Sequence, residues 1–288
     1  MKKFAFFILT ALCFGFTNQA YHNHFNEGTK TNFANPDNVS CAVDNVTFQS
    51  GEEISYSVYY NWGFIRIPAG EVTFKVDEEG NQYHFSVVGK TVKSYEWFFK
   101  VRDYYDSWVD KSTLLPNTSV RDVTEGGYTL YDKNEFNRNN NTIHNVRGRT
   151  LETVEEDNNF KVESCLHDML SIVYFTRNFD FSNYQTGDKF PMKLFIDKET
   201  WDLEVQYKGI ETNREVKDLG TFNTLKFSPQ VIEGDVFPDN AEVNMWVTND
   251  ANRLPVEIES PVSVGSVRAV LKDYKNLRYP MTAKVRAQ

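Results

Sequence analysis

The stretch CLHDMLSIVYFTRN at residues 165–178 is the centre around which the fold can be predicted. Its apolar side chains recur at steps of three and four residues, a spacing that gathers them on one face of a helix. The residues that share this face are Leu166, Met169, Leu170, Val173 and Arg177. Ser164 can cap the first turn, and Asp168 lies where the helix dipole favours an anion. The pattern predicts a helix over about 166–178.

The sequence on both sides of this helix alternates between apolar and polar residues, which is typical of strands with one buried face. Segments 54–60 (ISYSVYY) and 71–76 (EVTFKV) show the alternation clearly, and glycine-containing turns separate such runs. The 23 Phe and 15 Tyr also favour strands, on which flat rings pack well. We therefore predict a mainly β protein, an antiparallel curved sheet or open barrel around one central helix.

The two strand-rich regions share landmarks at nearly constant separation. Each carries a Trp-Val pair followed by Leu-Pro, within residues 108–116 and 246–255. The other paired landmarks are Gly51 with Gly187 and Gly126 with Gly265. This spacing favours an ancient duplication, although turn chemistry common to β-hairpins can produce the same likeness. We expect one β-rich domain at 45–275, with related halves at 45–163 and 185–275, and a basic tail at 276–288.

The N-terminus has the pattern of an export signal. Lys2 and Lys3 precede an apolar run at 4–16, which is too short to span a bilayer, and cleavage after Ala20 fits a signal peptide over residues 1–20. Two alternatives are a lipid anchor on Cys13, which lacks a small preceding residue, and an uncleaved anchor. We expect an exported protein, in the periplasm or associated with the outer membrane of a Gram-negative bacterium. The Asn-rich segment 21–44 is expected to be flexible.

Export gives the cysteines a meaning. After cleavage only Cys41 and Cys165 remain, and an oxidising compartment allows them to pair. The alternative is two separate thiols, with Cys165 buried at the start of the helix. We predict the disulfide, which would tie the N-terminal segment to the central helix. The absence of a C-x-x-C pattern argues against redox catalysis.

Composition excludes one class of partner. The chain has 31 Lys and Arg against 40 Asp and Glu, so it lacks the basic excess typical of nucleic-acid binders. After the signal, the sequence offers no apolar segment long enough for a transmembrane helix. We expect no nucleic-acid partner and no cofactor. We also expect no metal, because His22 and His24 in the flexible segment are more simply explained as solvated residues.

Three blocks of sequence together resemble a known family. They are Gly51-Glu52 before the alternating 56–60, the helix motif 168–177, and the segment WVTNDANRLPV at 246–256. These blocks resemble the domain of unknown function 3108 family of exported bacterial proteins over roughly residues 48–272. The resemblance implies an antiparallel β protein of the Gram-negative envelope, with no established activity. The Leu-Pro hairpin also resembles periplasmic lipoprotein carriers, whose curved half-barrel holds acyl chains.

Catalytic motifs are missing from the sequence. There is no G-x-S-x-G, H-E-x-x-H or phosphate-binding glycine loop, and no motif places a nucleophile beside His167. We expect a non-catalytic envelope protein that binds an apolar or amphipathic ligand, a lipid or glycan, in a concave sheet. The alternatives are a structural or adaptor protein that contacts another envelope component and, third, a hydrolase.

The candidate ligand-binding residues are aromatic side chains and two arginines. They are Trp97, Phe98, Tyr104, Tyr105, Arg177, Trp246 and Arg253. Aromatic rings of this kind can equally fill the core of a large sheet. Arg177 can pair with a carboxylate from a strand, and Arg253 can belong to a simple turn.

Overall fold

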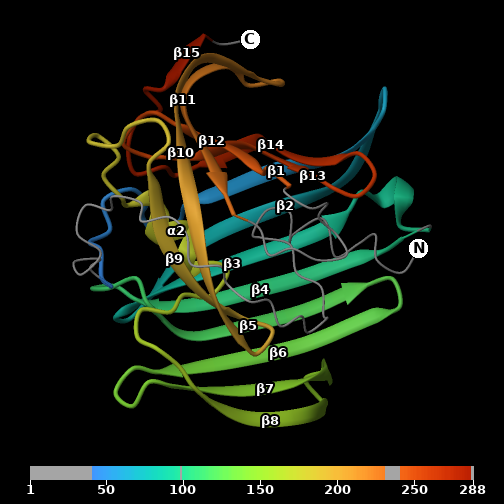
Figure 1. Ribbon diagram of the computed structural model, residues 1–288. Helices are drawn as coiled ribbons and strands as arrows, with labels where there is room; N and C mark the ends of the chain where they lie inside the picture. Colours follow the sequence, from blue (N-terminus) through green and yellow to red (C-terminus); the bar gives the residue numbers. More distant parts are fainter. Residues whose placement is uncertain (1–40, 98, 231–240, 287–288) are drawn as a thin grey trace.

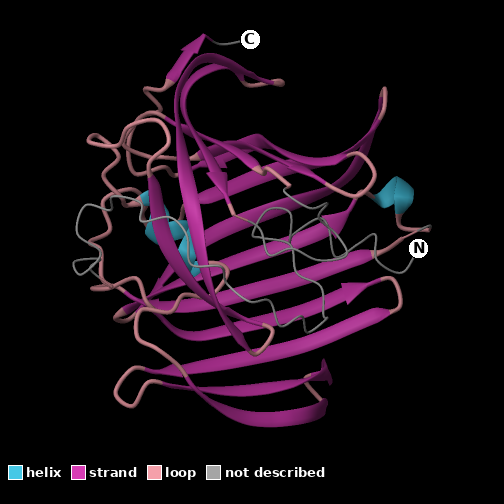
Figure 2. Cartoon of the chain, viewed as in Figure 1, coloured by secondary structure: helices cyan, strands magenta, loops and turns pink. Residues whose placement is uncertain are grey.

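The computed structural model describes residues 41–97, 99–230 and 241–286, and within these the chain forms one antiparallel sheet of fifteen strands (Figures 1 and 2). The predicted signal peptide and most of the segment 21–44 lie outside the described residues. The first half contains β1 (Glu53–Trp62), β2 (Ile65–Glu79), β3 (Gln82–Thr91), β4 (Val101–Asp110), β5 (Pro116–Glu125), β6 (Tyr128–Asn137), β7 (Thr142–Thr150) and β8 (Thr153–Lys161). The second contains β9 (Lys189–Ile196), β10 (Glu199–Val216), β11 (Gly220–Pro229), β12 (Asn244–Thr248), β13 (Pro255–Pro261), β14 (Ser266–Lys275) and β15 (Lys284–Arg286).

Each half is a meander, and the two meanders join in the middle of the sheet. Neighbouring strands follow the order β8 to β1 and then β14 to β9, because β1 pairs with β14 in antiparallel register. The sheet curls strongly, so β9 and β10 cross in front of the first half with α2 (Ser171–Arg177) between the layers (Figure 1). The predicted architecture, an open antiparallel sheet curved around one central helix, is confirmed.

Alternation along the strands explains the concave face. In β1 the side chains of Ile54, Tyr56 and Val58 are buried while the residues between them are partly exposed. The same period of two recurs in neighbouring strands, which gives the sheet one inward and one outward face. The helix and the inward face of the two layers share one apolar core.

The helix is shorter than the predicted span of 166–178. The backbone of His167 pairs instead with β9: its N–H donates to the carbonyl of Lys193 at 3.0 Å, and its carbonyl accepts from Phe195 at 2.9 Å. The N-cap position is Leu170, and the N–H groups of Leu170 and Ser171 donate to Asp168 Oδ1 rather than to Ser164. A long-range strand contact therefore takes the residues that local periodicity assigned to the first turn.

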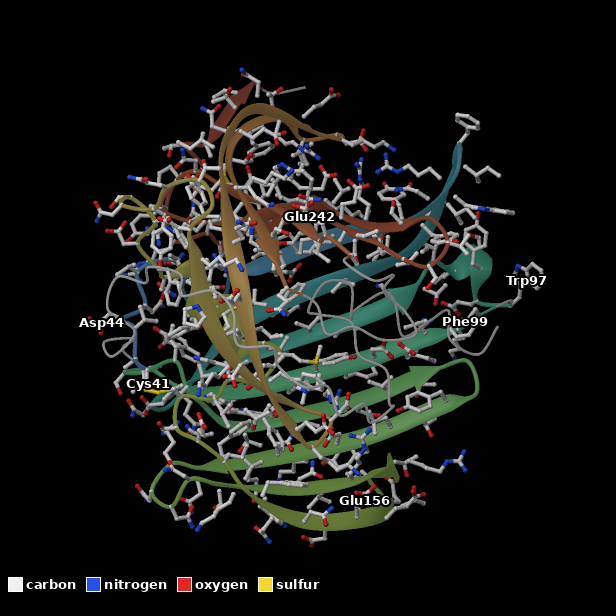
Figure 3. All side chains as sticks on the ribbon, in the orientation of Figure 1. Cys41, Asp44, Trp97, Phe99, Glu156 and Glu242 are labelled. Carbon is white, nitrogen blue, oxygen red and sulfur yellow. A yellow bond between two sulfur atoms is a disulfide. The ribbon has the colours of Figure 1, made fainter. Side chains whose placement is uncertain are left out.

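The predicted disulfide between Cys41 and Cys165 is present. It joins residues 124 positions apart, with Cα atoms 5.0 Å from each other. Figure 3 shows Cys41 on the left of the view, the side on which α2 lies in Figure 1. The bridge fastens the first described residue to the segment that leads into α2. In the segment expected to be a basic tail, β15 pairs with β11.

The paired landmarks of the two halves have the same backbone geometry. Gly51 and Gly187 both have positive φ, at 84° and 102°. The Gly51 N–H donates to the carbonyl of Val76 in β2, and the Gly187 N–H donates to that of Tyr207 in β10. Both acceptors lie on the second strand of their half, which supports the relation between the halves.

The corner before Leu-Pro is also shared. The pairing of β4 with β5 slips directly after Trp108, and the pairing of β12 with β13 slips directly after Trp246. The residue that precedes Leu-Pro is Leu114 in the first half and Arg253 in the second, with φ of 56° and 46°. Leu114 and Arg253 therefore occupy equivalent positions in two similar corners.

Candidate functional site

An apolar cavity lies between α2 and the two layers of the sheet. Its volume is about 1100 Å³, including the part that opens to solvent. Its walls come from α2, the segment that follows it, and the inward faces of β1, β2 and β9–β13. The lining residues are Ile54, Tyr56, Phe74, Ile172, Val173, Tyr174, Thr176, Arg177, Phe181, Phe190, Met192, Val205, Phe227, Pro229, Val243, Met245, Val247, Arg253, Pro255 and Ile258.

Arg177 belongs to the cavity wall but is already paired. Its Nη1 and Nη2 lie 2.6 and 3.0 Å from the two carboxylate oxygens of Glu52, and Nη2 also donates to the carbonyl of Asn252 at 3.0 Å. Arg177 and Glu52 are both almost completely buried, and the nearby Glu52 carboxylate raises the pKa of Arg177 despite desolvation. We expected Arg177 to pair with a carboxylate from a strand; it does pair with a carboxylate, but Glu52 directly precedes β1 instead of lying in it.

Arg253 lines the same cavity in a different electrostatic state. Its Nη1 donates to the carbonyl of Arg177 at 3.3 Å, and its guanidinium carbon is 5.6 Å from the ring centre of Phe181. Within the described part of the chain, no carboxylate forms an ion pair with it; burial lowers the pKa of Arg253, and the more distant carboxylate of Asp180 acts in the opposite direction. Arg253 is partly exposed as well as cavity-lining, so it lies where the cavity meets solvent.

The predicted aromatic candidates do not come together in this cavity. Trp97 has an exposed fraction of 84% and extends from the rim of the sheet (Figure 3), and Tyr104 is also exposed, on the outward face of β4. Tyr105 faces inward and lines a separate small cavity of about 270 Å³. Phe98 lies outside the described residues.

Trp246 lies on the outward face of β12. Its neighbours Met245 and Val247 line the cavity, so period-two alternation directs Trp246 away from it. The indole Nε1 donates to Glu211 at 2.7 Å, and the guanidinium carbon of Arg214 is 3.7 Å from the ring centre. This packing explains its burial without a ligand.

Most residues of the cavity wall carry no sequence pattern that marks them as ligand-binding. They include Phe190 and Met192 of β9, Val205 of β10, Phe227 of β11 and Met245 of β12. Alternation identifies which face of each strand is buried, but it does not show whether the space in front of that face is filled.

The inward face of β5–β7 carries a cluster of buried charged side chains. Arg121 and Arg147 approach both Asp132 and Asp197, with Arg121 Nη2 to Asp197 at 2.7 Å and Arg147 Nη1 to Asp197 at 2.9 Å. Asp197 comes from the β9–β10 turn, where it and Lys198 both have positive φ, as in a type I′ hairpin. The turn therefore brings in the second carboxylate that neutralises two buried guanidinium groups.

Two buried acids face each other at one end of β4 and β5. Asp103 has an exposed fraction of 0%, and Glu125 is also buried. Asp103 Oδ1 accepts the N–H of Thr124 at 3.2 Å. Burial and the neighbouring acid raise the pKa of Glu125 to about 9, and burial raises that of Asp103 to about 7. The pair therefore holds at least one proton near neutral pH.

His167 has an environment that disfavours acid–base chemistry. Burial lowers the pKa of His167 to about 3, and its Nδ1 lies 3.1 Å from Ser171 Oγ. Ser171 is fully buried, and its Oγ also accepts the N–H of Asp168 at 3.0 Å. Neither His167 nor Ser171 lines the large apolar cavity, the small cavity beside Tyr105 or a third cavity near Cys165. The contact between His167 and Ser171 therefore belongs to the hydrogen bonds at the start of α2.

Membrane-spanning helices and metal sites are both absent from residues 41–97, 99–230 and 241–286. No helix there combines the length and apolar character needed to cross a membrane. No group of three or more His, Cys, Asp or Glu side chains in the same ranges is arranged to hold a metal ion.

The model of a family described as "Protein of unknown function (DUF3108)" matches residues 55–272. The chain belongs to this family. The match agrees with the resemblance found in the three sequence blocks and covers both halves of the sheet. Among curated proteins, none matches the sequence.

A solved structure supports the architecture of this DUF3108 chain. It is the crystal structure of a β-barrel-like protein of domain of unknown function DUF1849 from Brucella abortus. The TM-score is 0.54 with 10% sequence identity, and the similarity covers 82% of this chain and 99% of the other. At that identity the likeness shows a shared fold.

Proposed function

We propose that this protein is an exported, non-catalytic component of the Gram-negative envelope that binds an apolar or amphipathic molecule in the cavity beside α2. The observation that carries the proposal is the cavity of about 1100 Å³ with a nearly continuous apolar wall. Burial of an acyl chain against such a wall is favourable by roughly 25 cal/mol per Å² of apolar surface. Few polar groups line it, as is usual for lipid and other hydrophobic sites.

Several features support binding over catalysis. Of the polar groups at the cavity, Arg177 is paired with Glu52, and Arg253 is a cation that stays protonated at any ordinary pH. An arginine can hold an anion but is a poor general base. The predicted export signal and the disulfide between Cys41 and Cys165 agree with an oxidising compartment.

The test combines a neutral fluorescent probe with a cavity-filling variant. We expect N-phenyl-1-naphthylamine, which fluoresces in apolar surroundings, to bind with one-to-one saturation. Met245→Trp places a large ring in the cavity and should remove this signal, because Met245 lines the wall from β12. Ser228→Trp is the matched control: Ser228 lies between the cavity-lining Phe227 and Pro229 and faces outward.

Native mass spectrometry provides an independent readout. The protein purified gently from a Gram-negative periplasm should carry extra mass that organic solvent removes, and Met245→Trp should carry less of it than Ser228→Trp. Failure of the probe to bind, or equal binding by both variants, would contradict a ligand site in this cavity.

A second candidate function, contact with an envelope membrane, rests on the β1–β2 hairpin tip. Phe64 is completely exposed there, and Trp62 and Ile65 have exposed fractions of 58% and 55%. Arg66 stacks on Tyr59, with 3.9 Å from the guanidinium carbon to the ring centre, and so places a cation beside the apolar tip. Exposed aromatic residues with adjacent basic groups favour an anionic bilayer surface.

Vesicle sedimentation tests this candidate separately from the cavity. The protein should sediment with vesicles that contain phosphatidylglycerol more than with phosphatidylcholine vesicles. Phe64→Ser should reduce sedimentation, whereas Val154→Ser, at an exposed apolar residue of β8, should leave it unchanged. Equal sedimentation of both variants with the unaltered protein would reject the hairpin tip as the contact.

A further inference from the structure

We propose that the ligand of the cavity ends in an anionic head group, a carboxylate or a phosphate, which the guanidinium of Arg253 binds where the cavity meets solvent. This inference rests on the proposed ligand-binding function and specifies the class of ligand: an acyl chain for the apolar wall and an anion for Arg253. It is carried by the contrast between the two cations that line the cavity.

Arg177 is not the residue that offers a charge to a ligand. Both oxygens of Glu52 and the carbonyl of Asn252 already accept hydrogen bonds from its guanidinium, and Glu52 is itself buried. A ligand anion near Arg177 would face the existing carboxylate. The Arg177–Glu52 pair therefore behaves as a neutral part of the wall.

Arg253 retains both its charge and most of its donors. A guanidinium has five N–H groups, and the structure records one hydrogen bond from Arg253, to the carbonyl of Arg177. In the ranges that the structure describes, no carboxylate forms an ion pair with it, and Asp180 acts on it only from beyond ion-pair distance. A partly buried cation beside an apolar wall lacks the solvation it would have in water, and an anion would restore a favourable partner.

The first half shows that the corner itself does not require an arginine. Leu114 occupies the equivalent position before Leu-Pro and has the same left-handed backbone, with φ of 56° against 46° at Arg253. Leu114 is completely buried and belongs to the core. An aliphatic side chain therefore satisfies the backbone and packing needs of this turn, so the charge of Arg253 calls for another explanation.

The hydrogen bond to Arg177 offers a structural explanation that must be separated from anion binding. Arg177 is the last residue of α2, where a cation also interacts favourably with the helix dipole. Three variants separate the roles. Arg253→Lys keeps the charge, Arg253→Gln keeps an N–H donor without charge, and Arg253→Leu reproduces the residue found in the first half.

The experiment displaces N-phenyl-1-naphthylamine from the full mature protein with three competitors of equal chain length. They are dodecanoate, dodecyl phosphate and dodecan-1-ol, used at pH 8 and below the concentrations at which they aggregate. At least one of the anions should displace the probe at a concentration about 10-fold or more below that of the alcohol, because a hydrogen bond to a charged group is worth more than one to a neutral group. Preference for dodecanoate assigns a carboxylate, and preference for dodecyl phosphate assigns a phosphate.

The variants decide whether Arg253 provides this preference. Arg253→Gln and Arg253→Leu should reduce the anion-to-alcohol ratio to about 1 while the neutral probe still binds, and Arg253→Lys should retain part of the ratio. Equal displacement by all three competitors with the unaltered protein would overturn the inference and leave the proposed function intact. So would a ratio that persists in both uncharged variants. Absence of probe binding would instead contradict the proposed function itself.

Discussion

The two halves of the sheet turn the same corner before Leu-Pro but place opposite kinds of side chain in it. Leu114 is completely buried in the core, whereas Arg253 lines a cavity and has no carboxylate within ion-pair distance in the described ranges. The backbone is similar at both positions, with φ of 56° and 46°. One half therefore uses the position for packing, and the other leaves a cation available at an opening.

The inward-facing side chains of the two halves also differ in character. Facing β5–β7, the guanidinium groups of Arg121 and Arg147 are balanced by Asp132 and Asp197. Facing α2, apolar walls enclose a cavity of about 1100 Å³. The first half therefore places paired charges on its inward face, and the second half places apolar side chains around a cavity.

The largest expected effect comes from giving the first corner the residue of the second. Leu114→Arg would bury a charge at a position with an exposed fraction of 0%, so we expect a loss of about 4 kcal/mol or more in the free energy of unfolding. Urea denaturation followed by circular dichroism measures it. Leu114→Met, which nearly conserves volume, should lose less than about 1.5 kcal/mol. Similar losses in the two variants would mean that the corner tolerates charge, and the comparison would fail.

Removal of the carboxylate that neutralises the cavity wall should have the next largest effect. Glu52→Gln leaves Arg177 buried without a counter-charge, so we expect a loss of about 3–4 kcal/mol in the free energy of unfolding. Glu53→Gln is the matched control, because its surface pairs with Lys75 and Lys275 should contribute less than about 1 kcal/mol. If the denaturation midpoints fell equally in both variants, the buried Arg177–Glu52 pair would contribute no more to stability than the surface pairs of Glu53.

The buried acids Asp103 and Glu125 should make the folded state less stable as pH rises, whereas most carboxylates do the opposite. Burial raises the pKa of Asp103 to about 7 and that of Glu125 to about 9, so the folded state keeps protons that the unfolded state releases near pH 4. This stabilisation is complete below the unfolded values and is lost as pH rises through the folded ones. Between pH 5 and pH 8 it should decrease by several kcal/mol, because the folded state holds more protons than the unfolded state over this range.

The double variant Asp103→Asn with Glu125→Gln isolates this contribution. Its unfolding free energy should rise relative to the unaltered protein as pH increases from 5 to 8. His167, whose pKa burial lowers to about 3, destabilises the folded state as pH falls below 6.5, but it is present in both proteins and cancels in the difference. A difference that stays constant over this pH range would show that the two acids are not protonated together in the fold.

The sequence was informative where local chemistry decides the structure. Period-two alternation predicted the strands, and Gly51 with Gly187 marked turns that do have positive φ. The helix start was predicted too early because the backbone of His167 pairs with β9, a contact that no local pattern reveals. Non-local strand pairing thus explains the main difference in the predicted elements.

Only part of the candidate site could be predicted from the sequence, because the rest depends on contacts between distant strands. Arg177 and Arg253 stood out as cations beside apolar residues, and both line the cavity. Tyr104 and Tyr105 are adjacent on one strand, so at most one of them can face inward, and the sequence does not show which. The cavity itself depends on how far the second layer stands from the first, which is set by contacts between distant strands.

The smallest expected effect completes the comparison of the corners. Arg253→Leu gives the second half the residue that the first half already uses, at a partly exposed position with no ion pair in the described ranges. We expect the free energy of unfolding to change by less than about 1 kcal/mol, because the loss of one hydrogen bond to Arg177 is offset by removal of a partly desolvated charge. Urea denaturation at low ligand concentration measures this change. A loss comparable to that of Leu114→Arg would assign Arg253 to the stability of α2, whereas an unchanged midpoint together with weaker anion binding would place its role in the ligand.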